Sequence, residues 1–357
     1  MEEPPSNLKK KLFIIGVLIL TGVLFFVGKS ALSSYYVDRG AAQIQAGDTD
    51  AAKQSFSNAL RFNTKNSKAH AYMGKIALGA LYPENEVIYP YADYPNAIKY
   101  FENSIQYNIK TTNPGLHSAT LEWLGHAYRE TREYGKMESV LLEKVSLYPR
   151  DAFWSRFILA RHYINTPKTQ VQKVFDVLLP ATELVKTVLQ KRNLYQVYSM
   201  LGRLANARED YDGAKTYMEL AIANAPKDTA SFDLQIAHNI LAILEGQKKN
   251  FSEAENHIKT AEKIAGKNMY GCVLGLAYLK GGETTKALSE AKKGDDPASG
   301  RELQSLCLRV LGDGNKQIGE RKKAKEYYEA YLLMIAQPIN IFQKQTHDKI
   351  QKEIQGL

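Results

Sequence analysis

Apolar residues recur at helical spacing along most of the chain, and glycine and proline interrupt them at intervals. Two of the clearest stretches are residues 39–63, RGAAQIQAGDTDAAKQSFSNALRFN, and residues 201–226, LGRLANAREDYDGAKTYMELAIANAP. Each contains a glycine, then a turn, then an alanine, a large residue four positions later and an alanine three beyond that. Residues 124–149 and 310–332 follow the same scheme. No sustained alternation typical of strands occurs, so the pattern predicts repeated helix–turn–helix units in an all-α fold.

This scheme resembles the tetratricopeptide repeat, a helix–turn–helix unit of 34 residues. The family has a small residue at position 8, alanine at positions 20 and 27 and a large ring at position 24. Eight residues of this chain fit position 8, at successive separations of 34, 51, 35, 42, 40, 33 and 37 residues. They are Gly40, Gly74, Gly125, Ala160, Gly202, Ala242, Gly275 and Gly312. Position 20 is filled by Ala52, Ala97, Ala214, Ala254, Ala287 and Ala324, and rings at position 24 are Phe56, Phe101 and Tyr328.

The resemblance covers residues 33–336 and implies a right-handed superhelix of antiparallel helix pairs. Small side chains let the two helices of a pair lie close together. A single pair cannot bury its apolar face, so several pairs must stack. Residues 339–354 are predicted to form a polar helix that caps the last unit.

Irregular spacing predicts how the repeats are grouped. The interval of 51 residues contains a loop insertion, GALYPENEVIYPYADYP, at 79–95 within an N-terminal half that spans 33–165. Residues 166–194 form an irregular helical segment that contains Pro167 and Pro180, and the C-terminal half is residues 195–336. The irregular segment marks either a bend in the superhelix or a boundary between the halves.

One segment near the N-terminus has the character of a membrane anchor. Residues 12–28, LFIIGVLILTGVLFFVG, carry no charge over 17 residues, which is the lower limit for crossing a bilayer. Lys9, Lys10 and Lys11 precede the segment, so residues 1–11 are expected to stay in the cytoplasm. The repeats would then face the periplasm or the exterior from an inner (plasma) membrane. A cleaved signal peptide has a similar pattern, and the sequence leaves cleavage open.

Composition narrows the remaining classes of protein. The chain is 44% hydrophobic and 24% charged, which fits a folded protein rather than a disordered one. Its net charge is +9, but the 47 basic and 38 acidic residues are interspersed, which argues against a nucleic-acid partner. The two cysteines exclude a multi-thiolate zinc site. Cys272 and Cys307 are interpreted as two buried apolar side chains, with a disulfide as the alternative in an extracytoplasmic domain.

No catalytic motif is present. The sequence lacks a phosphate-binding glycine loop, a nucleophile elbow and a metalloprotease helix. Its seven histidines include no pair three or four residues apart, the spacing that brings two metal ligands onto one helix face. We therefore predict that the chain is not an enzyme and that it has no catalytic residue, cofactor or metal site.

The resemblance implies two candidate surfaces for protein partners. In this family the first helix of each unit lines a concave groove, which here would present Lys75, His126, Arg129, Trp154, Phe157, Arg161, Gln196 and Arg203. Aromatic and arginine side chains are typical of protein-binding hot spots. Trp154 and Phe157 have the alternative of packing beneath the irregular segment. The insertion carries Tyr82, Tyr89, Tyr91 and Tyr94, which form either a docking loop or a loop folded back onto the repeats.

These features together predict a membrane-anchored, non-catalytic scaffold. It resembles bacterial inner-membrane repeat proteins that serve secretion, motility or envelope assembly. Its partners would be other proteins of a membrane-associated complex and, through residues 12–28, the lipid bilayer. The alternative is a cytoplasm-facing receptor that recruits soluble clients or chaperones to a membrane. Self-association stays open.

Overall fold

The computed structural model describes residues 6–79, 92–227, 229–265, 270–295 and 300–357. The side chains of residues 6–10, 12, 16, 18–26 and 270 lie outside this description. Over the described ranges the chain consists of helices and turns with no strand, so the predicted all-α class is confirmed there. The chain divides into two compact units, residues 1–151 and 152–357, called here the first and the second unit.

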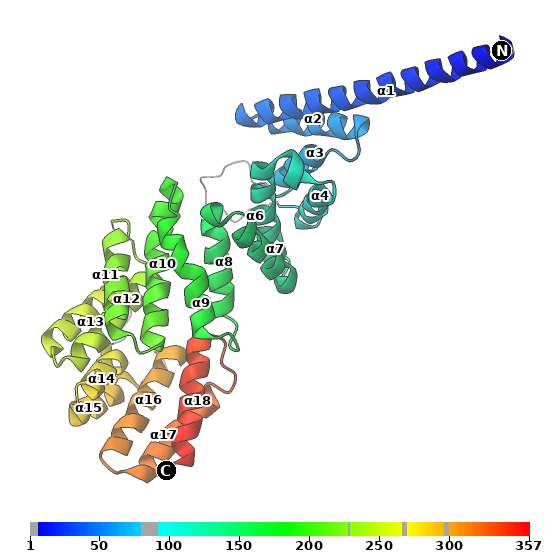
Figure 1. The fold of residues 1–357 in the computed structure, drawn as a ribbon. Coiled ribbons are helices and arrows are strands. Elements are labelled where there is room, and N and C mark those ends of the chain that lie inside the picture. Colours follow the sequence, from blue (N-terminus) through cyan, green and yellow to red (C-terminus); the bar gives the residue numbers. More distant parts are fainter. Residues whose placement is uncertain (1–5, 80–91, 228, 266–269, 296–299) are drawn as a thin grey trace. The chain divides into compact units, whose positions relative to one another are not determined.

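The first unit is a series of helix pairs (Figure 1). Three pairs correspond to the first three predicted repeats, and a short helix, α5 (Ile109–Thr112), separates the second pair from the third. The pairs are α1 (Ser6–Gln45) with α2 (Thr49–Phe62), α3 (Ser67–Ala77) with α4 (Tyr94–Gln106), and α6 (Pro114–Glu130) with α7 (Tyr134–Leu147). The turn η1 (Pro149–Asp151) ends the unit.

The second unit continues the same arrangement through five further pairs and a final helix (Figure 1). Its first pair is α8 (Phe153–Ile164) with α9 (Val171–Leu178), followed by the turn η2 (Leu179–Glu183). The next pairs are α10 (Val188–Ala207) with α11 (Tyr211–Asn224), α12 (Phe232–Gln247) with α13 (Phe251–Ala265), α14 (Tyr270–Lys280) with α15 (Thr284–Gly294), and α16 (Arg301–Gln317) with α17 (Arg321–Met334). The predicted capping helix is α18 (Ile341–Gln355).

The turn between the two helices of a pair has one recurring shape. Asp48 and Asp210 begin the second helix of their pairs, and each accepts a hydrogen bond of 3.0 Å from a backbone N–H three residues later. The residue just before this position has a positive φ angle, which ends the first helix in the left-handed region. Glycine occupies this site in some pairs and a side-chain-bearing residue in others: Gly47, Arg132, Glu209, Lys249, Gly282 and Gly319.

The small residues predicted at position 8 lie where the paired helices are closest. A Cβ atom added to Gly74 would lie 2.5 Å from the ring of Phe101, and one added to Gly312 would lie 2.4 Å from the ring of Tyr328. Both rings are fully buried. The ring of the second helix therefore fills the space that a side chain on the first helix would take.

Helix α1 runs without a break from the predicted anchor into the first repeat. Its C-terminal part packs on α2, where the buried Ser33 hydroxyl donates a hydrogen bond of 2.9 Å to the Ala59 carbonyl. Most side chains of the predicted anchor, residues 12–28, lie outside the description, as do residues 1–5 of the predicted tail. Among the residues that the structure describes, no helix combines the length and apolar character that crossing a membrane requires.

The two units divide after Asp151, so the irregular segment 166–194 belongs to the second unit. The sequence left this segment open as a bend in the superhelix or a boundary between the halves. It contains α9 and η2, and Val174 and Leu178 of α9 are fully buried against neighbouring helices. Most of the predicted insertion, residues 80–91, lies outside the described residues.

Candidate protein-binding surfaces

In the first unit, three of the predicted groove residues lie on α3 and α6 and are half-buried. The Lys75 ammonium lies 5.5 Å from the centroid of the Trp123 ring, a cation–π distance. Arg129 donates a hydrogen bond of 2.9 Å to Nδ1 of His126 and also pairs with Glu130 at 2.6 Å. The Lys75–Trp123 and His126–Arg129 pairs are together called here the α3–α6 surface.

The charges of the α3–α6 surface follow from its burial. Burial lowers the pKa of Lys75, whose amine lies beside the Trp123 ring. Burial and the neighbouring Arg129 lower the pKa of His126 to about 4, and Glu130 opposes them. His126 is therefore neutral at pH 7, which agrees with its Nδ1 acting as an acceptor for Arg129.

Two aromatic residues link this surface to the predicted docking loop and to the core. The ring of Tyr94, the first residue of α4, lies 6.4 Å from the His126 ring. Tyr82, Tyr89 and Tyr91 lie outside the described residues. Trp123 was not among the predicted groove residues, and its ring also lies 5.9 Å from that of Phe101. One feature of the sequence could have indicated Trp123, because the chain has only two tryptophans.

In the second unit, α8 supplies three predicted groove residues with different surroundings. Phe157 is only 5% exposed, and its ring packs 5.8 Å from Trp154, so it belongs to the core rather than to a binding face. Trp154 is half-buried. Arg161 is exposed, with its guanidinium 5.7 Å from the Phe157 ring. Trp154 and Arg161 are thus the α8 residues that a partner can reach.

Helix α10 carries the other two predicted residues, and one of them meets a distant part of the chain. Gln196 is half-buried and donates a hydrogen bond of 3.2 Å to the Tyr195 hydroxyl. The Arg203 guanidinium lies 4.4 Å from the ring of Phe342, which belongs to α18. The sequence analysis did not anticipate this contact, because the two residues are far apart in the chain.

Arg203 also belongs to a group of opposite charges. Burial lowers the pKa of Arg203, while Asp233 and Glu302 oppose this effect. Burial raises the pKa of Asp233, and Arg203 and Arg161 oppose that rise. Arg161, Arg203 and Asp233 come from α8, α10 and α12, so these three first helices bring their charges together on one face of the second unit.

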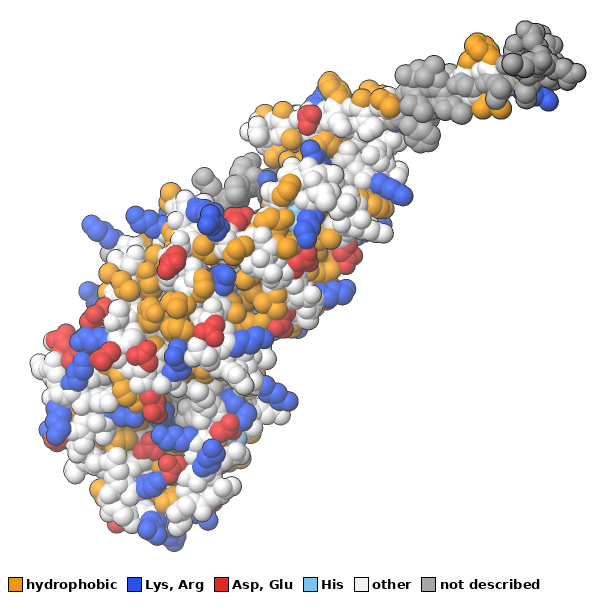
Figure 2. Space-filling view, viewed as in Figure 1, with side chains coloured by type: hydrophobic (Ala, Val, Ile, Leu, Met, Phe, Trp, Pro, Cys, Tyr) orange, Lys and Arg blue, Asp and Glu red, His pale blue; other side chains and the backbone are white. Residues whose placement is uncertain are grey.

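The predicted groove therefore consists of two sets of residues. Lys75, His126 and Arg129 belong to the first unit, and the other five belong to the second. On the face that Figure 2 shows, lysine and arginine side chains lie among aspartate and glutamate and form no basic stripe. This distribution agrees with the interspersed charges of the sequence.

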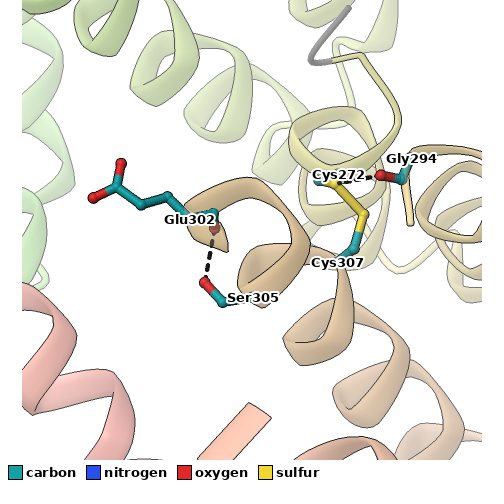
Figure 3. Close-up of a disulfide and its surroundings, with 5 residues drawn as sticks. All are labelled: Cys272, Gly294, Glu302, Ser305 and Cys307. Atoms are coloured by element: carbon teal, nitrogen blue, oxygen red, sulfur yellow. Dashed lines mark hydrogen bonds between the residues drawn. A yellow bond between two sulfur atoms is a disulfide. The ribbon is translucent and has the colours of Figure 1, made fainter. Parts of the chain in front are cut away.

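The two cysteines form a disulfide between α14 and α16, so the interpretation of two separate buried thiols was wrong (Figure 3). Both cysteines are buried, and their Cα atoms lie 4.7 Å apart. The stacking of adjacent repeats explains the pairing, because it packs α14 directly against α16. This packing is a property of the folded helices and leaves no local mark in the sequence.

A family comparison identifies the repeat. The family model for the tetratricopeptide repeat matches residues 195–228, which contain most of α10 and all of α11. The match places one tetratricopeptide repeat at residues 195–228. The curated proteins include no match to it.

Two solved structures are similar to this chain. A structure of PilF from Pseudomonas aeruginosa is 16% identical, covers 66% of this chain and 93% of its own, and has a TM-score of 0.45. The structure of the P58(IPK) tetratricopeptide domain is 14% identical, covers 98% of this chain and 97% of its own, and has a TM-score of 0.31. Proteins built from tetratricopeptide repeats are in general non-catalytic scaffolds that bind other proteins.

The second unit also has an open cavity of about 540 Å³. Its walls come from α11, α12 and α13 and include the Lys215–Glu245 ion pair at 2.8 Å. At one side, Nδ1 of His257 lies 3.0 Å from Nδ1 of His238. Among the described side chains, no cluster of three or more residues is arranged to hold a metal ion. The charges of this cavity are therefore paired with one another.

Proposed function

We propose that this tetratricopeptide repeat protein is a membrane-anchored, non-catalytic scaffold that holds protein partners of a cell-envelope complex. Its N-terminal helix anchors it in the inner membrane through residues 12–28. Its repeats face the periplasm or the exterior. The fold supports the scaffold role. The continuous helix α1 supports the anchor, and the disulfide supports the orientation.

The buried disulfide is the observation that carries the orientation. Disulfides persist in oxidising compartments, whereas the cytosol keeps thiols reduced. Cys272 and Cys307 are the chain's only cysteines, and they are bonded to each other. A cytosolic repeat domain of this kind would keep both thiols reduced. The bond therefore supports repeats on the outer side of the membrane.

The continuity of α1 supports anchoring. The uncharged segment 12–28 and the first helix of the first repeat belong to one 40-residue helix. Lys29 and the exposed Tyr35 follow the segment within two turns of helix. Lysine and tyrosine are suited to the headgroup region at the end of a membrane span. This arrangement would hold the first repeat close to the lipid surface.

The aromatic and basic side chains at the surface, most of them half-buried, support protein partners. The α3–α6 surface of the first unit presents Trp123 with Lys75 and Arg129, and α8 of the second unit presents Trp154 with Arg161. Tryptophan and arginine dominate the binding energy of many protein interfaces, because they combine a large contact area with directed hydrogen bonds. These residues are therefore the expected contacts of the partner.

A protease-accessibility assay on intact spheroplasts tests the orientation. Added protease should degrade the repeats without lysis. Alkylation under denaturing conditions should modify neither cysteine until the sample is reduced. Protection of the repeats in intact spheroplasts, with cleavage only after lysis, would defeat the outward orientation and favour the cytoplasm-facing receptor. The intact mass of the purified protein distinguishes an anchor, which is retained, from a signal peptide, which is removed.

Affinity capture in mild detergent tests the partner surface. The Arg161→Glu variant should lose partners that the wild-type chain captures, because the substitution reverses the charge on an exposed part of α8. Arg321→Glu, which reverses an exposed charge at the start of α17, is the matched control and should retain them. Partners that survive Arg161→Glu but are lost on deletion of residues 82–94 would place the site on the tyrosine loop instead.

A further inference from the structure

The C-terminal helix α18 connects the two ends of the second unit. It follows the last repeat, yet it contacts α8 of the unit's first repeat as well as α17 (Figure 1). All residues of α18 are described, and only Ile341, which is 1% exposed, and Ile350, which is 2% exposed, are buried. These two residues are nine positions apart, about two and a half turns, so they point to opposite sides of the helix. Each end of α18 is therefore held by a different part of the unit.

The N-terminal end of α18 lies on the face where the groove was predicted. Phe342 packs 4.4 Å from the guanidinium of Arg203 on α10. Arg203 interacts there with Asp233 of α12 and Glu302 of α16. Figure 3 shows the Glu302 side chain pointing away from the disulfide. The first helices that should receive a partner are thus already covered by a segment of the same chain.

The C-terminal end of α18 packs on the last repeat. Ile350 is buried among Tyr331 and Ile335, and Ile354 packs against the same cluster. Glu353 forms an ion pair with Lys316 of α16. This end behaves as an ordinary capping helix, so α18 combines a cap with an extension across the face of the unit.

One charge of α18 is unfavourable on the covered face. Lys349 of α18 and Arg309 of α16 both act electrostatically on Lys280 of α14, and all three side chains are positive. Desolvation lowers the pKa of Lys280, as do Arg309 and Lys349, whereas Asp313 and Glu209 oppose the shift. A helix with a carboxylate at the place of Lys349 would replace this repulsion with attraction.

Helix α18 is also weakly held. It has many polar residues, its N-cap Asn340 accepts a hydrogen bond of 2.9 Å from Gln343, and two buried side chains anchor it. Elements with few buried apolar contacts open at low free-energy cost. A better-matched helix can therefore compete with it for the face of α8, α10, α14 and α16.

We propose that the face covered by α18 is a binding site for an acidic amphipathic helix of a partner protein, which displaces α18. The partner carries an aliphatic–aromatic pair in the place of Ile341 and Phe342 and a carboxylate in the place of Lys349. This inference rests on the protein-binding role proposed above and names the chemistry of one partner. It is independent of membrane orientation, so its failure and the failure of the proposed topology are distinguishable.

Fluorescent peptides that copy residues 340–357 test the site without knowledge of the partner. The double substitution Ile341→Asp with Phe342→Ala detaches the N-terminal end of α18 in the full chain, which is called here the opened chain. Leu333→Ala, at a highly exposed site of α17, is the matched control. The peptide should bind the opened chain. It should bind the wild type and the control much more weakly, because the tethered helix acts at an effective concentration on the order of mM.

Two altered peptides test the proposed chemistry. A Lys349→Glu peptide should bind the opened chain roughly threefold more tightly, as expected for a new ion pair in place of a repulsion. A Phe342→Ala peptide should bind about tenfold more weakly, because it loses its aromatic anchor.

No binding of any peptide by an opened chain that retains its helical circular dichroism would overturn the proposal. Equal affinities for the Lys349 and Glu peptides would overturn the acidic partner. A dimer of the opened chain that excludes the peptide would identify a second copy as the occupant instead.

Hydrogen exchange of the wild-type chain decides the question if the opened variant does not fold. Excess Lys349→Glu peptide should accelerate amide exchange in α18 while leaving α16 and α17 protected. Unchanged exchange of α18 at a saturating peptide concentration would show that the helix is a fixed part of the fold.

Discussion

Single glycines decide how closely the paired helices approach. At Gly74 of α3, the ring of Phe101 from α4 occupies the space that a side chain would need. A buried ring cannot fold away as a flexible aliphatic side chain can, so it must shift as a whole. Gly135 of α7 has no atom within 4 Å of an added Cβ and is the natural comparison.

The first prediction follows from this contact. Gly74→Ala should lower the free energy of unfolding by about 2 kcal/mol, because the added Cβ forces the helices apart. Gly135→Ala should leave stability unchanged or raise it by up to about 1 kcal/mol, since alanine favours helix. Chemical denaturation followed by circular dichroism measures both. Equal effects of the two substitutions would contradict the steric explanation.

At the scale of helices, a buried ion pair joins the two members of one pair. The Lys144 side chain on α7 is 3% exposed and lies 2.5 Å from Glu122 on α6, whose side chain is 25% exposed. A buried charge without a partner is much less stable than a buried apolar side chain of similar size. Removing Glu122 and removing Lys144 should therefore change the stability of the protein by different amounts.

The second prediction uses this inequality. Glu122→Ala should destabilise the protein by about 3 kcal/mol, because it leaves the Lys144 ammonium buried and unpaired. Lys144→Met removes the buried charge itself and should cost less than about 1 kcal/mol. Thermal unfolding of the two variants gives the comparison. A larger loss for Lys144→Met would show that the ion pair itself stabilises the helices.

A histidine contact between α12 and α13 gives a pH dependence. Burial and the neighbouring His257 lower the pKa of His238 to about 4, and burial lowers the pKa of His257 although Glu253 opposes it. The folded protein thus keeps both rings neutral at pH values where the unfolded chain binds protons. Stability is highest above the ordinary histidine pKa and is lost as the pH falls from about 6.5 towards 4.

The third prediction is a change in that pH dependence. Between pH 7 and pH 5 the wild type should lose about 1 to 2 kcal/mol more stability than His238→Gln, because the variant has no ring to protonate at this site. Urea unfolding at a series of pH values measures the difference. Parallel stability curves for the two proteins would show that the unfolded and folded states bind protons equally at His238.

At the scale of the whole molecule, the chain forms two units, and the second has the only covalent cross-link among the described residues. The disulfide joins residues 35 positions apart and connects the first helices of adjacent repeats. Such a link restricts the unfolded chain more than the folded one. Repeat proteins otherwise depend on contacts between neighbouring repeats, so the link adds stability where the last repeats meet.

The fourth prediction concerns this bond. Reduction of the wild type should destabilise the second unit by about 3 kcal/mol, as expected for a loop of this length. Cys272→Ala with Cys307→Ala should have the lower stability from the start and should not respond to reductant. Calorimetry with and without reductant tests both statements. A wild-type transition that reductant leaves in place would exclude a stabilising role for the bond.

Much of the repeat architecture could be predicted because its rules are local. Gly40 and Phe56 belong to one pair and touch, and their spacing in the chain is enough to recognise the contact. The same rule works for Gly312 and Tyr328. The candidate surfaces were harder to predict. Phe157 satisfies the groove spacing, yet it is buried, because spacing assigns a helix face but not what covers that face.

The sequence by itself determined the helix pairs, the small residues at their crossings and the capping helix, since each depends on residues within one helix or two consecutive helices. Only the tertiary structure decided that Cys272 meets Cys307, that Trp123 lies beside Lys75 and that Phe342 covers Arg203. These contacts depend on how successive pairs are rotated and stacked. That rotation is the sum of many small packing preferences, and no single stretch of sequence encodes it.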